Sequence, residues 1–121
     1  MNLLEISSTH KTPTISFNPN SGIFLIEGWS TPEDSFVFYE PVISWLTEYE
    51  KNPSEVTEFS VKLSYYNTSS SKWILEIFYI LEKIHRMHSV KVNWYYDDED
   101  MEETGQDYSS MVHIPFNFIE I

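Results

Sequence analysis

Short apolar or alternating segments predict five strands along the chain. The segments are 14–17, 23–28, 59–65, 90–96 and 113–119. In the third of these, Phe59, Val61 and Leu63 alternate with polar residues, which is the pattern of a strand with one buried face. The turn sequence Asn18-Pro19-Asn20-Ser21-Gly22 separates the first two segments, so we expect these two strands to form an antiparallel hairpin.

The segment from Thr31 to Pro53 predicts a helix with a defined start. Thr31 is a capping residue, Pro32 would occupy the first helical position, and two acids follow in the first turn. Apolar residues then recur at helical spacing as far as Asn52-Pro53, where we expect the helix to end. Pro41 lies within this pattern, so we expect either a kink there or a separate short turn that begins the helix.

A second long helix is expected after the third strand, and a short one near the end of the chain. The apolar residues of the long helix recur at three- and four-residue steps without an intervening Gly or Pro; they are Trp73, Ile74, Ile77, Leu81 and Ile84. The short helix is expected from Asp98 to Tyr108 and to stop near Gly105, because acids gather at its start and few apolar residues follow.

These elements predict a mixed α/β fold. Helices between strands imply crossover connections, so a sheet of about five strands should be antiparallel at the N-terminal hairpin and parallel where helices intervene. Two main helices should pack on this sheet, with the short third helix beside them. A chain of 121 residues without a linker, repeat or low-complexity segment is expected to form a single domain over residues 1–121.

The composition narrows the classes of partner. Seven Lys and Arg against nineteen Asp and Glu give a formal charge of −12, which repels nucleic-acid phosphates and anionic lipid headgroups. We therefore expect neither nucleic acid nor a membrane as a partner. The chain has no cysteine, no signal-peptide pattern and no long apolar run, so the cytoplasm is the expected compartment.

Motifs typical of enzymes and metal sites are missing. Neither a Gly-x-Ser-x-Gly elbow nor a glycine-rich phosphate loop occurs, and the whole chain holds three glycines, so we expect no enzyme and no cofactor. His85 and His88 are three residues apart on a predicted helix but lack a third ligand at suitable spacing. We therefore expect no metal site at these two residues.

Carboxylates cluster between Asp97 and Glu103. The cluster lacks the glycine and the final bidentate Glu of a calcium loop, so we interpret it as the solvated first turn of the short helix, where acids favour the helix dipole. Its first acids, Asp97, Asp98 and Asp100, also form a candidate docking face for a basic partner.

Four hydroxyl groups stand where the second long helix is expected to begin. They belong to the segment Asn67-Thr68-Ser69-Ser70-Ser71-Lys72. A helix N-terminus exposes unpaired N–H groups and a partial positive charge, so a phosphate on one of these hydroxyls would be electrostatically favoured. Asn, Ser and Thr are also the commonest helix caps. The segment therefore fits both a plain cap and a covalent switch.

Five segments of the chain occur together in one order. The most specific are Leu63-Ser64-Tyr65-Tyr66-Asn67-Thr68-Ser69-Ser70-Ser71-Lys72 and Trp94-Tyr95-Tyr96-Asp97, and the others are 12–17, 44–46 and 114–116. In this order they resemble the SiaC family of small bacterial regulatory phosphoproteins over nearly the whole chain. The resemblance implies a fold similar to the anti-sigma-factor antagonists of the STAS class. In such proteins a partner kinase phosphorylates a Ser or Thr at the start of a helix, and a PP2C-type phosphatase removes the phosphate.

The resemblance implies a role for each residue of the hydroxyl segment. The phosphoacceptor falls on Thr68, and Asn67, Ser69, Ser70, Ser71 and Lys72 form the supporting loop. Whether Ser69 or Ser70 is also modified stays open. The resemblance further implies that the bare protein binds and activates an effector, in the family a diguanylate cyclase, and that phosphorylation breaks the complex.

We therefore expect a non-enzymatic partner-switching protein. Its expected partners are a protein kinase, a PP2C-type phosphatase and an effector protein. The alternative from another class is a small-molecule-binding module that uses the aromatic residues around Trp94 and Tyr96.

Overall fold

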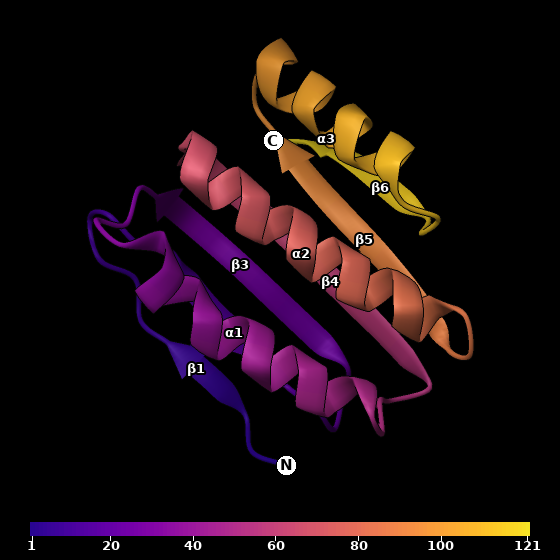
Figure 1. Ribbon diagram of the computed structural model, residues 1–121. Helices are drawn as coiled ribbons and strands as arrows, with labels where there is room; N and C mark the ends of the chain where they lie inside the picture. Colours follow the sequence, from indigo (N-terminus) through magenta and orange to yellow (C-terminus); the bar gives the residue numbers. More distant parts are fainter.

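The computed structural model describes residues 1–121 as one six-stranded sheet with three helices. The strands are β1 (Leu4–Ile6), β2 (Thr14–Phe17), β3 (Ile23–Ser30), β4 (Val56–Tyr66), β5 (Ser89–Tyr96) and β6 (Phe116–Glu120). The helices are α1 (Ser35–Glu50), α2 (Thr68–His85) and α3 (Glu99–Met111). All three helices lie on the same face of the sheet (Figure 1).

The strands follow one another across the sheet in chain order, from β1 to β6. β1, β2 and β3 pair antiparallel, whereas β3, β4, β5 and β6 pair parallel across the three helical crossovers. This confirms the predicted mixed α/β fold with its antiparallel start. The sheet has one strand more than the five segments predicted, because β1 has only three residues and is too short for alternation to reveal.

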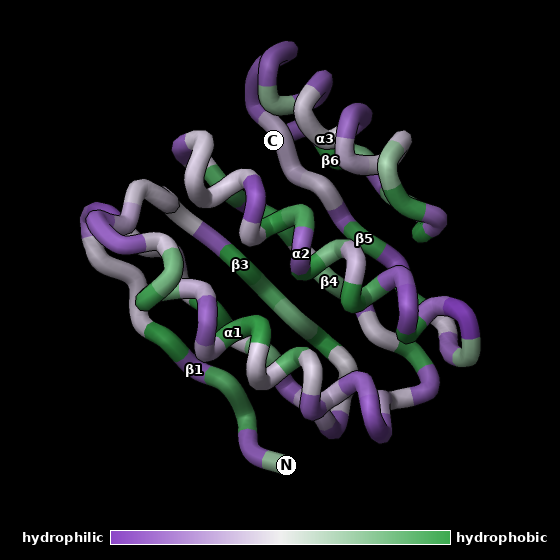
Figure 2. Tube along the Cα trace, in the orientation of Figure 1, coloured by the Kyte–Doolittle hydropathy of each residue, from purple (hydrophilic) through white to green (hydrophobic).

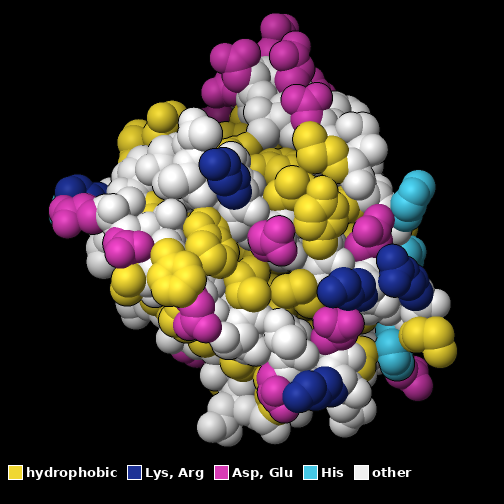
Figure 3. All heavy atoms as spheres, viewed as in Figure 1, with side chains coloured by type: hydrophobic (Ala, Val, Ile, Leu, Met, Phe, Trp, Pro, Cys, Tyr) yellow, Lys and Arg dark blue, Asp and Glu magenta, His cyan; other side chains and the backbone are white.

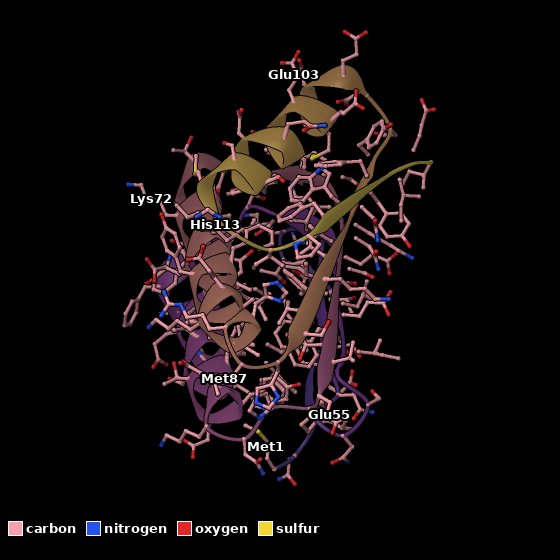
Figure 4. All side chains as sticks on the ribbon, turned by 90° about the vertical axis from the view of Figure 1, so that its right-hand side faces the viewer. Met1, Glu55, Lys72, Met87, Glu103 and His113 are labelled. Atoms are coloured by element: carbon pink, nitrogen blue, oxygen red, sulfur yellow. The ribbon has the colours of Figure 1, made fainter.

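The two faces of the sheet differ in character. In β4, the residues that alternate toward the helices are buried, and they are Thr57, Phe59, Val61 and Leu63. The opposite face is left open and carries polar contacts, such as the 2.7 Å hydrogen bond from Asn93 to Glu58 and the 3.2 Å bond from Asn117 to Asn93. Figure 4 shows side chains that project from the strands on this open side. Burial on one face only explains the alternation seen in the sequence.

The first helix begins later than the sequence predicted. Asp34, not Thr31, is its N-cap, and the Asp34 carboxylate accepts a 3.1 Å hydrogen bond from the Val37 amide. Thr31 is used elsewhere, because its hydroxyl accepts a 3.0 Å hydrogen bond from the Trp29 indole. Pro41 lies inside one continuous helix, so the alternative of a separate short turn is wrong.

The prediction that the third helix stops near Gly105 is wrong, because α3 continues to Met111. A Cβ atom at Gly105 would lie 2.5 Å from the ring of Trp94, which is fully buried. The glycine is therefore required by close packing of α3 on β5 and not by a helix end. The last strand also begins later than predicted, at Phe116 and not at His113.

A Gly105→Ala substitution is expected to lower the free energy of unfolding by about 1–3 kcal/mol. Ala is the better helix former, but the new methyl group would force the Trp94 ring or α3 to shift in a packed core. Urea unfolding monitored by circular dichroism measures the change, and Gln106→Ala at an exposed neighbouring position serves as the control. An unchanged or higher stability for Gly105→Ala would contradict this packing.

The helices also have a clear hydropathy pattern. Hydrophilic and hydrophobic positions alternate along α1 and α2, as expected for helices with one face on a sheet (Figure 2). None of the helices combines the length and the apolar character that are needed to cross a membrane.

Candidate functional site

The predicted hydroxyl segment lies at the C-terminal ends of the two central strands, β3 and β4. Ser30, the last residue of β3, pairs with Tyr66 at the end of β4, and the Ser30 carbonyl accepts a 3.1 Å hydrogen bond from the Asn67 amide. Asn67 is the N-cap of α2, and its side chain accepts a 2.9 Å hydrogen bond from the Ser70 amide. The predicted helix start is therefore confirmed, with Thr68 as the first helical residue.

The four hydroxyls of this segment have different surroundings. Ser69 donates a 3.1 Å hydrogen bond to the Asn67 side chain, and Ser71 donates a 2.7 Å bond to the Thr68 carbonyl. Ser70 is fully buried. Thr68 is exposed, and its hydroxyl forms no hydrogen bond in the structure. Only the Thr68 hydroxyl is therefore both accessible and free.

Ser70 belongs to a buried polar network that the sequence did not reveal. Ser70 donates a 3.1 Å hydrogen bond to the Ser30 carbonyl and accepts a 2.9 Å bond from the Ser30 hydroxyl. The Tyr39 hydroxyl lies 2.5 Å from the Ser30 hydroxyl, and burial raises the pKa of Tyr39. The network joins β3, α1 and α2. No local pattern could have signalled it, because Ser30 and Ser70 are 40 positions apart in the chain.

A Ser70→Ala substitution is expected to lower the free energy of unfolding by about 1–3 kcal/mol, because it removes both hydrogen bonds between the buried Ser70 hydroxyl and Ser30. Ser69→Ala is the matched control at an exposed position and should change stability by less than about 0.5 kcal/mol. Thermal and urea unfolding of the two variants measure the difference. Equal stability losses in both would mean that the buried network adds nothing to the fold.

Lys72 supplies positive charge one turn after Thr68. Its side chain is exposed and takes part in none of the three ion pairs of the structure, which involve Lys11, Lys51 and Lys91. In Figure 4 Lys72 projects from the first part of α2 away from the sheet. The amides of Thr68 and Ser69 also have no acceptor within the helix, as is general for the first helical residues. This end of α2 can therefore accommodate negative charge.

A groove lies between α2 and α3, beside the hydroxyl segment. It has a volume of about 260 Å³ and is lined by Tyr66, Ser71, Lys72, Leu75, Thr104, Asp107, Tyr108 and Met111. Tyr108 donates a 3.1 Å hydrogen bond to the Ser71 carbonyl, and burial raises the pKa of both Tyr66 and Tyr108. Figure 3 shows hydrophobic side chains gathered between α2 and α3, and acidic side chains over the start of α3.

Of the predicted acidic docking residues, Asp97 and Asp98 lie in the turn between β5 and α3, and Asp100 lies in the first turn of α3. Asp98 is the N-cap of α3 and accepts a 2.7 Å hydrogen bond from the Met101 amide, whereas Asp97 and Asp100 are exposed. No hydrogen bond or ion pair joins these acids to the segment 67–72. The structure has no group of three or more His, Cys, Asp or Glu residues arranged to hold a metal ion. A docking role for the acids stays a prediction.

Trp94 lies in the core, contrary to the alternative hypothesis drawn from the sequence, which placed it in a small-molecule site. It is 0% exposed, its indole donates a 2.9 Å hydrogen bond to the Met101 carbonyl, and its ring lies 5.6 Å from the ring of Tyr108. Tyr96 is partly buried and borders a cavity of only about 30 Å³. The aromatic residues named for a small-molecule site therefore belong mainly to the core.

Comparisons with known proteins agree with one another. A family model described as SiaC family regulatory phosphoprotein matches residues 6–121. An uncharacterized protein of Pseudomonas aeruginosa strain UCBPP-PA14 is 30% identical over 119 residues, which cover 96% of this chain and 94% of that protein.

Two crystal structures from Pseudomonas aeruginosa have the same fold. Apo-SiaC aligns with a TM-score of 0.90 and 29% identity over 98% of this chain and 99% of that chain. A chain from the crystal structure of the diguanylate cyclase SiaD in complex with its activator SiaC aligns with a TM-score of 0.91, 29% identity and the same coverage.

Proposed function

The chain belongs to the SiaC family of regulatory phosphoproteins, and on that premise we propose that it is a partner-switching protein without enzymatic activity of its own. The bare protein binds and activates a diguanylate cyclase, as SiaC of Pseudomonas aeruginosa is the activator of SiaD. A partner kinase phosphorylates Thr68 and ends that complex, and a PP2C-type phosphatase restores it. The observation that carries the proposal is the exposed, unbonded Thr68 hydroxyl at the start of α2.

The fold of this chain can tolerate the phosphate. A phosphate on Thr68 adds about −1.5 to −2 charges and three strong acceptor oxygens. Nearby donors are the amides of Thr68 and Ser69 at the positive end of the helix dipole and the free ammonium group of Lys72. Phosphorylation therefore leaves the sheet and helices intact, and its consequence falls on the surface around Thr68.

A partner docked over that surface is affected strongly. Its binding would bury the phosphate, or place it against carboxylates, and the loss of hydration without full compensation costs several kcal/mol. A loss of about 2.7 kcal/mol already corresponds to about 100-fold in affinity. One modification at Thr68 can therefore turn an activating complex off.

Activity of the cyclase tests the proposal. Purified bare chain, added to the diguanylate cyclase of the same cells, should raise its turnover of GTP, and the Thr68-phosphorylated chain should not. Ser69→Ala, at the neighbouring exposed hydroxyl, should activate and be switched off like the wild type. Equal activation by the bare and phosphorylated chains would overturn the switch. No activation by the bare chain would overturn the assigned effector.

A further inference from the structure

Thr68 lies one helical turn before Lys72, which lines the groove between α2 and α3. Residues three, four and seven positions apart share one face of a helix, so Thr68 lies on the same face as Lys72 and Leu75. Lys72 and Leu75 both line the groove, as does Ser71, whose hydroxyl bonds to the Thr68 carbonyl. A group added to Thr68 would therefore lie next to whatever occupies the groove.

Four of the eight residues that line the groove are apolar or aromatic, and these, apart from the buried Tyr108, are only partly covered. Leu75 on α2 is half-buried, Tyr108 closes the base, and Met111 at the end of α3 is 54% exposed. Exposed large apolar side chains that surround a concave surface mark sites of interaction. The groove can thus receive an apolar side chain of a partner between the two helices.

The charged residues around the groove indicate which kind of residue the partner should carry beside that apolar side chain. Three of the seven cations form ion pairs, Lys62 lies 4.5 Å from the centre of the Tyr95 ring on the open face of the sheet, and Lys83 and Arg86 lie at the far end of α2. Asp107, on the α3 side, is the one carboxylate that lines the groove, whereas Lys72, on the α2 side, is the one cation and has no ion pair in the structure. A carboxylate of the partner is the group that complements Lys72.

We propose that the effector docks in this groove through a segment that carries an apolar side chain beside an acidic residue, with the carboxylate paired to Lys72. This inference rests on the proposed function. Phosphorylation then acts on Lys72 itself, because a phosphate on Thr68, one helical turn away, binds the ammonium group and repels the partner's carboxylate. Lys72 is therefore the residue through which phosphorylation of Thr68 changes the binding of the effector.

Two exposed variants test the groove with matched controls. Lys72→Gln should weaken binding of the bare chain to the cyclase by about tenfold, whereas Lys83→Gln on the same helix should leave it unchanged. Met111→Lys should weaken binding by about tenfold or more, whereas Met87→Lys, at a side chain that is 84% exposed, should not. Circular dichroism and unfolding curves of all four variants establish that the fold is intact.

A measurement without the effector tests the contact between Lys72 and the phosphate. In the Thr68-phosphorylated chain, a ³¹P NMR titration should give a higher second pKa for the phosphate when Lys72 is replaced by Gln, because the cation stabilises the dianion. Lys83→Gln should leave that pKa unchanged. An equal phosphate pKa in the wild type and in Lys72→Gln would overturn the role of Lys72 in the switch.

The outcomes separate this inference from the proposed function. If the bare chain binds the cyclase and phosphorylation breaks the complex, but Lys72→Gln and Met111→Lys bind as the wild type does, the groove is not the docking site and the switch stands. A change in oligomeric state caused by Met111→Lys, with cyclase binding unchanged, would assign the groove to a second copy of the chain and overturn the inference. If the wild-type bare chain does not bind the cyclase, the proposed function itself fails.

Discussion

Replacing Thr68 by glutamate is expected to weaken binding to the effector cyclase by about 100-fold. Thr68 is exposed at the first position of α2, so the new carboxylate lies on the protein surface beside the proposed docking groove and not in the core. There it adds a charge that the complex must desolvate, next to the groove where we place an acidic residue of the partner. Isothermal titration calorimetry with purified cyclase measures the dissociation constant for the wild type and the variant.

Two further substitutions at Thr68 separate charge from shape. Thr68→Ser keeps the hydroxyl and should bind as tightly as the wild type, and it should still be switched off by the kinase. Thr68→Val keeps the shape without the hydroxyl, so it should bind tightly and resist phosphorylation. An intact Thr68→Glu chain with undiminished affinity for the cyclase would remove the electrostatic basis of the switch.

Replacing Trp94 by alanine is expected to lower the free energy of unfolding by about 3–5 kcal/mol. The ring is fully buried between β5 and α3, and its indole nitrogen is bonded to the Met101 carbonyl. The substitution leaves a large cavity beside Gly105 and removes the contact with Tyr108. Since α3 forms one wall of the groove, the loss also loosens the proposed docking surface.

Urea unfolding monitored by far-ultraviolet circular dichroism measures the effect, and Trp29→Ala is the control. Trp29 is 45% exposed on the open face of the sheet, so its loss should cost much less. Trp94→Phe retains most of the packing and should fall between the two, which keeps the comparison informative if the alanine variant does not fold. Equal losses for Trp94→Ala and Trp29→Ala would contradict the core position of Trp94.

The sequence predicted the elements whose pattern is created by burial on one face. The alternation in β4 and the helical spacing in α2 follow directly from the single helix-covered face of the sheet. Errors arose where a local signal had two meanings. Thr31 and Asp34 are both residue types that cap helices. In the structure Asp34 caps α1, whereas the Thr31 hydroxyl accepts a hydrogen bond from the Trp29 indole.

The helix end predicted at Gly105 was wrong because the glycine is needed for a tertiary contact. A glycine late in a helical segment is typical of a helix end, but here it allows Trp94 to approach α3 closely. The approach depends on a strand that precedes the helix and on the packing of both elements. No window of sequence around Gly105 contains that information.

The sequence predicted the candidate site as a whole segment, and the structure shows which of its hydroxyls are exposed and which are buried. Asn67 as cap and Thr68 at the helix start follow from the composition of the segment. The difference between the exposed Thr68 and the buried Ser70 does not follow from it, because Ser70 is hydrogen-bonded to Ser30 at the end of β3, 40 positions away. The groove that joins Lys72 to Met111 likewise exists only once α2 and α3 lie on the same face of the sheet.

The most direct test of the switch is the affinity of one preparation of the chain for its diguanylate cyclase in two states. The protein is phosphorylated completely on Thr68, verified by site-mapping mass spectrometry, and half of it is then treated with a PP2C-type phosphatase. We expect the phosphatase-treated half to bind at least about 100-fold more tightly than the phosphorylated half. Equal affinity of the two halves would contradict the account.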